Sequence, residues 1–476
     1  MQNVIKHSAV CRFISMIAAW FGGQWKKSSI VKRMTTAGSG ERVSDGSLFT
    51  RLWLKAHRSY ASAFERLRLT KLLDGSIFAK PYIWCFLTAV LAPILPTKFV
   101  IVLAAASAIS VFLAYGCDRE RRIPNAPANK FVFLYAAIYL AATVASVSFR
   151  GSMYVGALTI LFILFAIMLQ SAVQTRKQLD VLLYALITAG ALVALYGVYQ
   201  YVFGKTGGET WVDSDMFSDI SARVYSTLQN PNVLSEYLLL VIPLCFAMVI
   251  SPGGGLKRLF FIGCLAVTCL CLVLTFSRGG WLGLVFGMAV FLIMLDRRFI
   301  LAGVVGIIAL YFLLPETIVS RFTSIGNLSD SSTSYRVYIW MGTVAMLRDY
   351  WLSGVGPGQA AFNKVYPYYS YNAIIAPHSH NLFLQIMCDT GICGFAVFIL
   401  LLLAYFRQVC SALKREKDKT SRYLQMGMIA SMCGFLVQSV TDYSFYNYRV
   451  MLMFWVFIAV GALVSRRTEM KEGGIW

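Results

Sequence analysis

Apolar runs of about twenty residues recur along almost the whole chain, and no other feature limits its fold so strongly. A run of about 20 apolar residues is the length that a helix needs to cross a bilayer. The chain is 58% hydrophobic and only 14% charged, whereas soluble domains carry about 25% charged residues. The sequence therefore predicts an all-α polytopic membrane protein rather than a large soluble protein with an apolar core.

The runs predict about twelve transmembrane helices, with boundaries good to a few residues. They cover 82–96, 99–116, 131–149, 152–174, 181–203, 233–251, 259–276, 280–296, 299–314, 381–406, 423–440 and 450–464. Cytoplasmic loops of membrane proteins are enriched in Lys and Arg. With the N-terminus inside, the interior loops and the C-terminal tail hold 19 Lys/Arg after residue 81, against 10 in the exterior segments. We therefore expect both termini to be cytoplasmic.

The spans divide the chain into a basic cytoplasmic extension, 1–81, a transmembrane domain, 82–464, and a cytoplasmic tail, 465–476. The extension holds 14 Lys/Arg against 4 acidic residues, and the whole chain has a net charge of +21. A cluster of basic residues beside a membrane is attracted to anionic lipid. The remaining basic residues mostly mark alternate loops, so the charge indicates a membrane partner and no nucleic acid.

Two predicted outer loops are long, 204–232 and 315–380. Loops above about 15 residues are usually functional or disordered. The second loop precedes the tenth span and contains aromatic residues and a helix-like segment, 334–350. We expect this large loop to be ordered.

Two of the four histidines, His378 and His380, close the second loop. A neutral imidazole accepts a proton from a hydroxyl group, so His380 is a candidate catalytic base and His378 a candidate binding residue. A capping or interfacial histidine is the alternative. The spacing of the two also permits a metal site, but no third ligand is near. The pair Asp213 and Asp215 has the spacing of a metal-nucleotide site, which is frequent by chance. We expect no metal and no cofactor.

Arginines on the outer face need a reason, because the positive-inside tendency works against them. Arg278 lies at the turn between two spans, and Arg336 opens the helix-like segment of the second loop. Guanidinium groups bind phosphate through paired hydrogen bonds, so both arginines favour a phosphate-bearing substrate. Snorkelling to lipid headgroups and a solvated helix charge are the alternatives.

Further polar residues around the predicted outer face are candidates for substrate binding. Arg223 precedes the turn that contains Asn232, Asn381 follows the second histidine, and Arg449 ends the last outer turn. Amide side chains can bind sugar hydroxyls, and the aromatic residues of the last turn, with Asp442, could hold sugar rings. Turn chemistry and an interfacial aromatic belt are the alternatives.

Several short motifs occur in a fixed order between the same predicted helices. They are NPN at 230–232, SRGGWLG at 277–283, GVGPG at 354–358, HNLFLQ at 380–385 and DTGICG at 389–394. Together with Arg336 and Trp340 they resemble the O-antigen ligase and Wzy polymerase superfamily of bacterial membrane glycosyltransferases. The resemblance covers roughly residues 82–464.

This resemblance implies a bacterial cytoplasmic (inner) membrane protein whose active site faces the periplasm or the cell exterior. It implies a metal-independent glycosyltransferase of surface polysaccharide biosynthesis. The donor would be a glycan on polyprenyl (undecaprenyl) diphosphate, and the acceptor a glycan or lipid-glycan hydroxyl. The essential arginines of the family correspond to Arg278 and Arg336, and its histidine to His380. Arg223 matches a further arginine less firmly.

Three questions stay open at this level. Polymerases and ligases share donor, fold and motifs, so the sequence does not separate them. A lipid-linked glycan flippase or another polytopic transporter is the main alternative function, although transporters place ionisable groups near the bilayer midplane. A structural scaffold would point its arginines apart into lipid headgroups.

Overall fold

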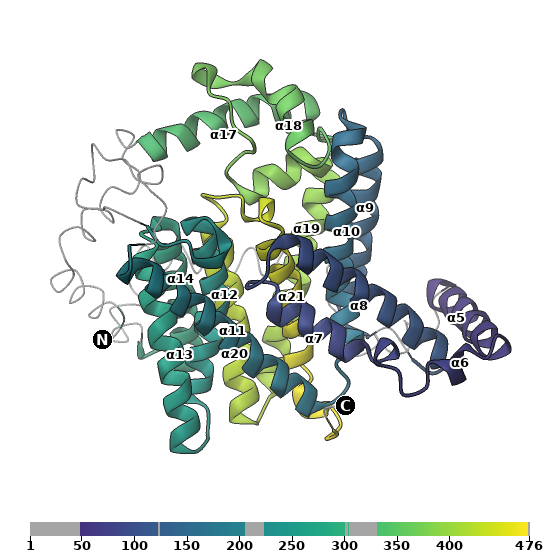
Figure 1. Cartoon of the computed structure of the whole chain (residues 1–476). Coiled ribbons are helices and arrows are strands. Elements are labelled where there is room, and N and C mark those ends of the chain that lie inside the picture. The colour runs from purple at the N-terminus through teal and green to yellow at the C-terminus, as the bar shows by residue number, and fades with distance from the viewer. Residues whose placement is uncertain (1–47, 122–123, 205–222, 300–302, 304–330, 475–476) are drawn as a thin grey trace, which may run out of the picture. The chain divides into compact units, whose positions relative to one another are not determined.

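The computed structural model describes residues 48–121, 124–204, 223–299, 303 and 331–474 (Figure 1). These residues are nearly all helical or in turns. They contain no β-strand, and one isolated bridge joins Thr175 and Lys471. The chain forms two compact units, one of Met1–Lys71 with Tyr115–Arg119, and the other of Leu72–Ala114 with Glu120–Trp476.

The described part of the smaller unit consists of α5, the short α6 and the segment 115–119. One face of α5 is apolar and packs within the unit: Ala61 is fully buried, and Phe64 lies against Gly116. The His57 Nε2 atom lies 2.8 Å from the carbonyl oxygen of Tyr115. The opposite face carries exposed basic residues, including Lys55 and Arg66. This helix is therefore amphipathic, with its charged face outward.

The described residues fold into α-helices, with a few short 3₁₀ helices between them. Their bounds are α5 Leu48–Arg66, α6 Leu69–Leu72, α7 Pro81–Leu91, α8 Thr97–Cys117, α9 Asn129–Val144, α10 Phe149–Ala172, α11 Arg176–Val202, α12 Pro231–Ile250, α13 Gly255–Leu274, α14 Arg278–Leu295, α17 Ser331–Tyr350, α18 Gln359–Val365, α19 Leu382–Arg415, α20 Lys419–Gln438 and α21 Tyr448–Val464. Short 3₁₀ helices are η1 Ile77–Ala79, η3 Ser226–Leu228, η4 Tyr366–Tyr369, η5 Tyr371–Ala373, η6 Ser444–Tyr446 and η7 Arg467–Glu469.

Within the described residues, 7 helices are long and apolar enough to cross a membrane: α8, α10, α11, α12, α13, α14 and α19. The apolar helices α7, α9 and α21 are shorter. A helix lies over every predicted span except 299–314, which falls almost wholly outside the described residues. The helical membrane fold is confirmed, whereas the count of about twelve spans and the cytoplasmic termini stay predictions.

Glycines allow α14 to approach α20 closely. A Cβ atom added at Gly283 would lie 2.6 Å from the carbonyl oxygen of Gly434, and one at Gly287 would lie 2.7 Å from that of Ala430. The backbones of α14 and α20 therefore approach each other closely at these glycines. In the turn before α14, Phe276 adopts a positive φ of 46°.

The segment after α17 docks on a break in α19. Gly391 interrupts α19 with a φ of 65° and a ψ of −169°, a conformation that is essentially restricted to glycine. The Ile392 amide donates to the carbonyl of Trp351 at 2.8 Å, and the Val355 amide donates to that of Cys388 at 2.6 Å. These two bonds hold α17 and α18 at the end of the helical bundle where α19 begins (Figure 1).

Of the predicted loop 315–380, the structure describes 331–380, which form α17, α18, η4 and η5. Gly354, Gly356 and Gly358 all have positive φ angles, of 67°, 101° and 93°. The φ angles explain the repeated glycines of the motif, because a side chain at each position would be strained. The segment 205–222 of the first long loop, with Asp213 and Asp215, lies outside the described residues.

Candidate active site

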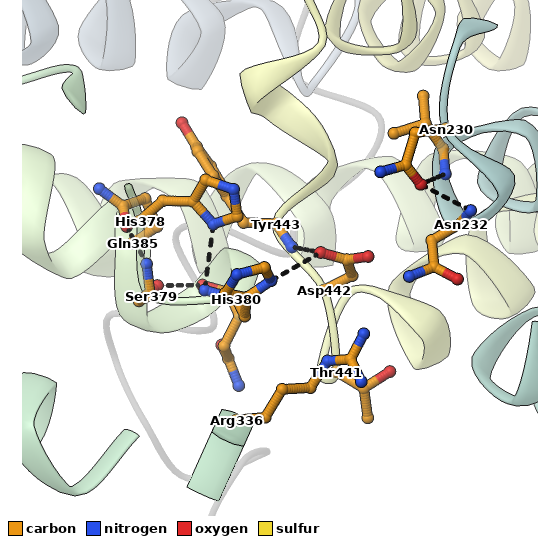
Figure 2. Close-up of polar contacts among 12 residues, drawn as sticks. Asn230, Asn232, Arg336, His378, Ser379, His380, Gln385, Thr441, Asp442 and Tyr443 are labelled. Carbon is orange, nitrogen blue, oxygen red and sulfur yellow. Dashed lines mark hydrogen bonds and ion pairs between the residues drawn. The ribbon is translucent and has the colours of Figure 1, made fainter. Parts of the chain in front are cut away.

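A histidine and an aspartate meet at the start of α19 (Figure 2). The His380 Nδ1 atom lies 3.4 Å from the Asp442 Oδ1 atom. His380 has a φ of 49°, a left-handed conformation that is uncommon for a non-glycine residue and costs about 1–3 kcal/mol. The Trp340 Nε1–H group donates to the carbonyl of His380 at 3.3 Å. The Trp340 side chain of α17 thus holds the backbone of His380, while Asp442, in the segment 439–443 after α20, lies beside its imidazole.

Asp442 is a buried carboxylate that supports the imidazole. Its side chain also accepts a hydrogen bond from the Tyr443 amide at 2.8 Å. Burial alone raises the pKa of Asp442, but the hydrogen bond from His380 and the charge of Arg336 outweigh it and hold the pKa well below its ordinary value. The carboxylate is therefore ionised at neutral pH and stabilises a proton on the adjacent imidazole.

His378, which is itself neutral, contacts the backbone of His380. It is buried, and its Nδ1 atom accepts a hydrogen bond from the His380 amide at 3.3 Å. Its ring stacks on that of Tyr446, with the centroids 4.9 Å apart. Burial and the neighbouring His380 lower the pKa of His378 from 6.5 to about 3. His378 is therefore neutral at neutral pH, and its contact with the His380 amide holds the two histidines together.

Two guanidinium groups share one hydroxyl group beside this pair. Arg336 donates to the Ser332 Oγ atom at 2.7 Å, and Arg278 donates to the same atom at 3.3 Å. Arg278 is the first residue of α14, and a Cβ atom added at Gly279 would lie 3.0 Å from the Thr441 Oγ1 atom. Figure 2 shows Arg336 reaching toward Thr441 and Asp442.

One guanidinium at the site has a free donor. The Arg336 Nε–H group is buried and has no hydrogen-bond partner among the described residues. A buried cationic donor of this kind favours binding of an anion. Diphosphate is an anion that arginines bind well, since its oxygens match the planar donor fork.

Arg223 and Asn232 pair with each other beside the site. Arg223 is buried, and it donates to the Asn232 Oδ1 atom and to the carbonyl of Thr275, both at 2.8 Å. The Gln438 side chain donates to the carbonyl of Asn232 at 2.8 Å. These bonds tie the start of α12 to the ends of α13 and α20. Among the predicted binding residues, these two have a clear structural role.

Asn381 and Arg449 also make structural contacts. Asn381 caps α19 by accepting from the Leu384 amide at 3.0 Å, and it donates to the carbonyl of Val440 at 2.7 Å. Arg449 is buried and donates to the carbonyl of Leu95 at 3.4 Å. The hydrogen bonds of Arg449 thus lead to the connection between α7 and α8, whereas those of Asn381 help to position His380.

Sequence reasoning missed two parts of the site. Asp442 was expected to orient a sugar, and its pairing with His380 was not foreseen, although it is the one acidic residue of the segment 439–449. Ser332 carried no signal at all. Glu236 is a further buried carboxyl in α12, and its two oxygens have no hydrogen-bond partner among the described residues.

A metal interpretation of the two histidines finds no support in the geometry. Their rings lie 4.2 Å apart, and one Nδ1 atom is already used by a backbone amide. Within the ranges that the structure describes, no group of three or more His, Cys, Asp or Glu side chains could hold a metal ion.

Comparison with known proteins shows a similarity to one family model and to solved structures. The O-antigen ligase family model matches residues 259–399, a range that contains Arg278, Arg336 and His380. A solved chain from "Structural coordination of polymerization and crosslinking by a peptidoglycan synthase complex" is similar at a TM-score of 0.40 and 14% identity. The similarity covers 73% of this chain and 98% of that chain. No curated protein matches.

Proposed function

We propose that the chain is a membrane glycosyltransferase of surface polysaccharide biosynthesis, because the O-antigen ligase family model matches its residues 259–399. The donor is a glycan on a polyprenyl diphosphate such as undecaprenyl diphosphate, and the acceptor is a hydroxyl group of a glycan or lipid-glycan. The observation that carries this proposal is the His380–Asp442 pair beside two guanidiniums that share Ser332.

The two arginines stabilise the leaving group. When the bond between the anomeric carbon and the donor diphosphate breaks, negative charge develops on the diphosphate oxygens. Arg278 and Arg336 are fixed donors beside the places where these oxygens lie, and pre-positioned charge of this kind lowers the barrier in a site of low dielectric. We propose that the guanidiniums replace the magnesium ion of many soluble enzymes, so that transfer continues in EDTA.

The imidazole activates the acceptor. His380 takes the proton of the acceptor hydroxyl as its oxygen attacks the anomeric carbon from the face opposite the diphosphate. Asp442 stabilises the imidazolium that forms, and His378 holds the ring in place through the amide of His380. The proton then leaves His380 for water or the released polyprenyl diphosphate, which restores the neutral imidazole.

The side of the membrane that the site faces is inferred from the charge of the loops. The proposed orientation places the site at the outer face of a bacterial cytoplasmic membrane, with both termini inside, because Lys and Arg concentrate in the opposite set of loops. Anionic lipid on the inner leaflet is the proposed partner of the basic extension.

A transporter is the second candidate, and the positions of the charged residues argue against it. Arg278 is the first residue of α14, and His380 lies just before α19. Transporters bind substrate near the bilayer midplane at broken helices, whereas these residues lie at helix ends. The choice between polymerase and ligase depends on the acceptor, and product length decides it.

The experiment that tests the proposal uses cells that lack the protein and carry the His380→Asn variant at wild-type level. Asparagine tolerates a positive φ, so the backbone is preserved. We expect lipid-linked glycan to accumulate and surface polysaccharide to fall, as in cells without the protein. Normal polysaccharide with no accumulation would reject the proposed function.

A further inference from the structure

Aromatic rings follow one another away from the candidate base. The Tyr335 ring meets the His380 ring edge-on, with centroids 5.8 Å apart and an interplanar angle of 69°. Tyr338 lies three residues further along α17, on the same face. Its ring stacks on that of Tyr371 at 5.5 Å and 25°. The row His380, Tyr335, Tyr338 and Tyr371 thus begins at the site and continues along α17.

The rings of this row are partly exposed. The side chain of His380 is 21% exposed, and Tyr335 and Tyr371 are 36% and 47% exposed. Aromatic rings that form a packing core are normally covered, as Tyr366 is in the same segment. A continuous row of half-exposed rings is instead typical of a surface that binds another molecule.

The backbone under Tyr371 is strained. Asn372 and Ala373 both adopt positive φ angles, of 53° and 55°. Asparagine tolerates this region, but alanine does not, and such residues cost about 1–3 kcal/mol each. The Tyr335 hydroxyl donates to the carbonyl of Ile375 at 3.4 Å, which ties the same turn back to α17. Strain of this kind persists at binding sites because the surrounding structure enforces it.

We propose that Tyr335, Tyr338 and Tyr371 form a subsite that binds the acceptor glycan by stacking against its sugar rings. This inference rests on the proposed function, since His380 defines where the reacting hydroxyl lies. One face of a pyranose ring presents C–H groups, which pack on aromatic rings, while tyrosine hydroxyl groups bond to the sugar hydroxyls at the edge. The row extends past one sugar unit, so the subsite selects an oligosaccharide over a monosaccharide.

Two other uses of the same rings make different predictions. A structural clip, in which Tyr371 merely fastens η5 to α17, would need apolar packing and no ligand. An interfacial belt would place the rings in lipid headgroups and would leave binding of free sugar unaffected. Both are outcomes that the binding experiment separates from the subsite.

The experiment measures the Kd of the full-length protein in detergent for an oligosaccharide released from the surface polysaccharide of its own host. We expect Tyr371→Ala to weaken binding about tenfold, which corresponds to about 1.4 kcal/mol. Tyr371→Phe keeps the ring and should stay within about threefold of wild type. Tyr371→Leu keeps apolar packing without a ring, so it should weaken binding as alanine does while the Tm stays at the wild-type value.

The His380→Asn variant separates this inference from the function on which it rests. It should fail to transfer glycan, and adding Tyr371→Ala to it should still weaken oligosaccharide binding about tenfold. Wild-type binding by Tyr371→Ala and Tyr371→Leu would overturn the subsite and favour the clip or the belt. Absence of binding by the wild-type protein would also overturn it, while the accumulation of lipid-linked glycan would still report on the proposed function.

Discussion

Two arginine clusters lie near opposite ends of α20, and they differ in the partners that their guanidinium groups bind. Near its start, Arg467 donates to both oxygens of Asp180, at 2.7 and 2.9 Å, and to Asp418 at 3.2 Å. Beyond its end, Arg278 and Arg336 both donate to the Ser332 Oγ atom, and the Nε–H group of Arg336 has no hydrogen-bond partner in the described part of the chain.

This difference distinguishes a structural cluster from the proposed binding site. Each guanidinium nitrogen of Arg467 already donates a hydrogen bond, one of them also to the Ser421 Oγ atom at 2.9 Å. An arginine bonded in this way holds helix ends together and has little capacity for a ligand. The buried Nε–H group of Arg336, by contrast, has no partner among the described residues, and the proposed diphosphate donor would supply an acceptor for it.

Arg336→Ala should give the largest effect on glycan transfer. A normal transfer rate in this variant would contradict the distinction between the two arginine clusters. Loss of one fixed donor to a developing charge costs about 10²–10³-fold in rate, and we expect transfer to fall by that factor. The Tm should stay near the wild-type value because Arg336 forms no salt bridge with the described residues. Transfer assays on purified protein provide the measurement, and Arg336→Lys should recover only part of the rate because lysine lacks the planar fork.

Gly391→Ala should destabilise the frame that holds the site. A Cβ atom at this position would lie 2.0 Å from the carbonyl oxygen of Leu352. We expect a loss of about 3 kcal/mol from crowding and from the φ angle, seen as a lower Tm in detergent. The matched control is Gly263→Ala in α13, where no atom lies within 4 Å of an added Cβ. Equal Tm values for the two variants would contradict the docking of α17 on the α19 break.

Arg467→Ala should lower stability and leave glycan transfer normal, which is the reverse of the result expected for Arg336→Ala. It leaves Asp180 and Asp418 without their cation, but these side chains are 24% and 38% exposed. We therefore expect a loss of about 1–3 kcal/mol, below that for a fully buried pair. Glycan transfer per folded molecule should stay normal at a temperature well below the Tm. A loss of transfer without a loss of stability would break the distinction between the clusters.

Stability should also depend on pH through His378, by at most about 1.4 kcal/mol over one pH unit. Its pKa is lowered from 6.5 to about 3 in the folded protein, so the unfolded chain binds the extra proton in this range. Stability is therefore fully present above pH 6.5 and falls by about 1.4 kcal/mol per pH unit below it. We expect the Tm to drop between pH 6.5 and 4.5, and to drop less in His378→Asn, which keeps an acceptor for the His380 amide.

Other titratable or charged groups beside His378 limit the pH range in which its protonation can be tested. His380, Asp442 and Arg336 face it, and Asp442 begins to take a proton only below its ordinary range, so pH 4.5 is a safe lower limit. Identical pH profiles for His378→Asn and wild type would show that His378 is not a buried neutral imidazole.

The helices could be predicted because their apolar runs are a local property, whereas the site depends on contacts between distant segments. The ranges of α10, α12 and α13 agree with prediction to within a few residues. The helix α19 continues to Arg415 instead of ending at 406, because its last turns are amphipathic and extend beyond the apolar run. Helix α20 lies over the predicted span 423–440, but it is not among the seven helices that are long and apolar enough to cross a membrane.

Only some residues of the candidate site could be predicted from the sequence. They are residue types that are rare at the outer ends of membrane helices. His380, Arg278 and Arg336 are charged or titratable groups at helix ends, and motif order identified them. The partner of His380 lies 62 residues away in sequence, and nothing local connects Asp442 to it. The row of tyrosines that begins at His380 was equally invisible, because Tyr371 reaches α17 through a turn with two positive φ angles.

The central claim is that His380 and the guanidiniums beside it carry out glycan transfer. The most direct test is the single-turnover rate of transfer from polyprenyl diphosphate-linked glycan by purified His380→Asn, beside wild type and Arg467→Ala. General base catalysis contributes about 10²–10⁴-fold, so we expect His380→Asn to be slower by at least a factor in this range while Arg467→Ala keeps the wild-type rate. A wild-type rate in folded His380→Asn would contradict the account.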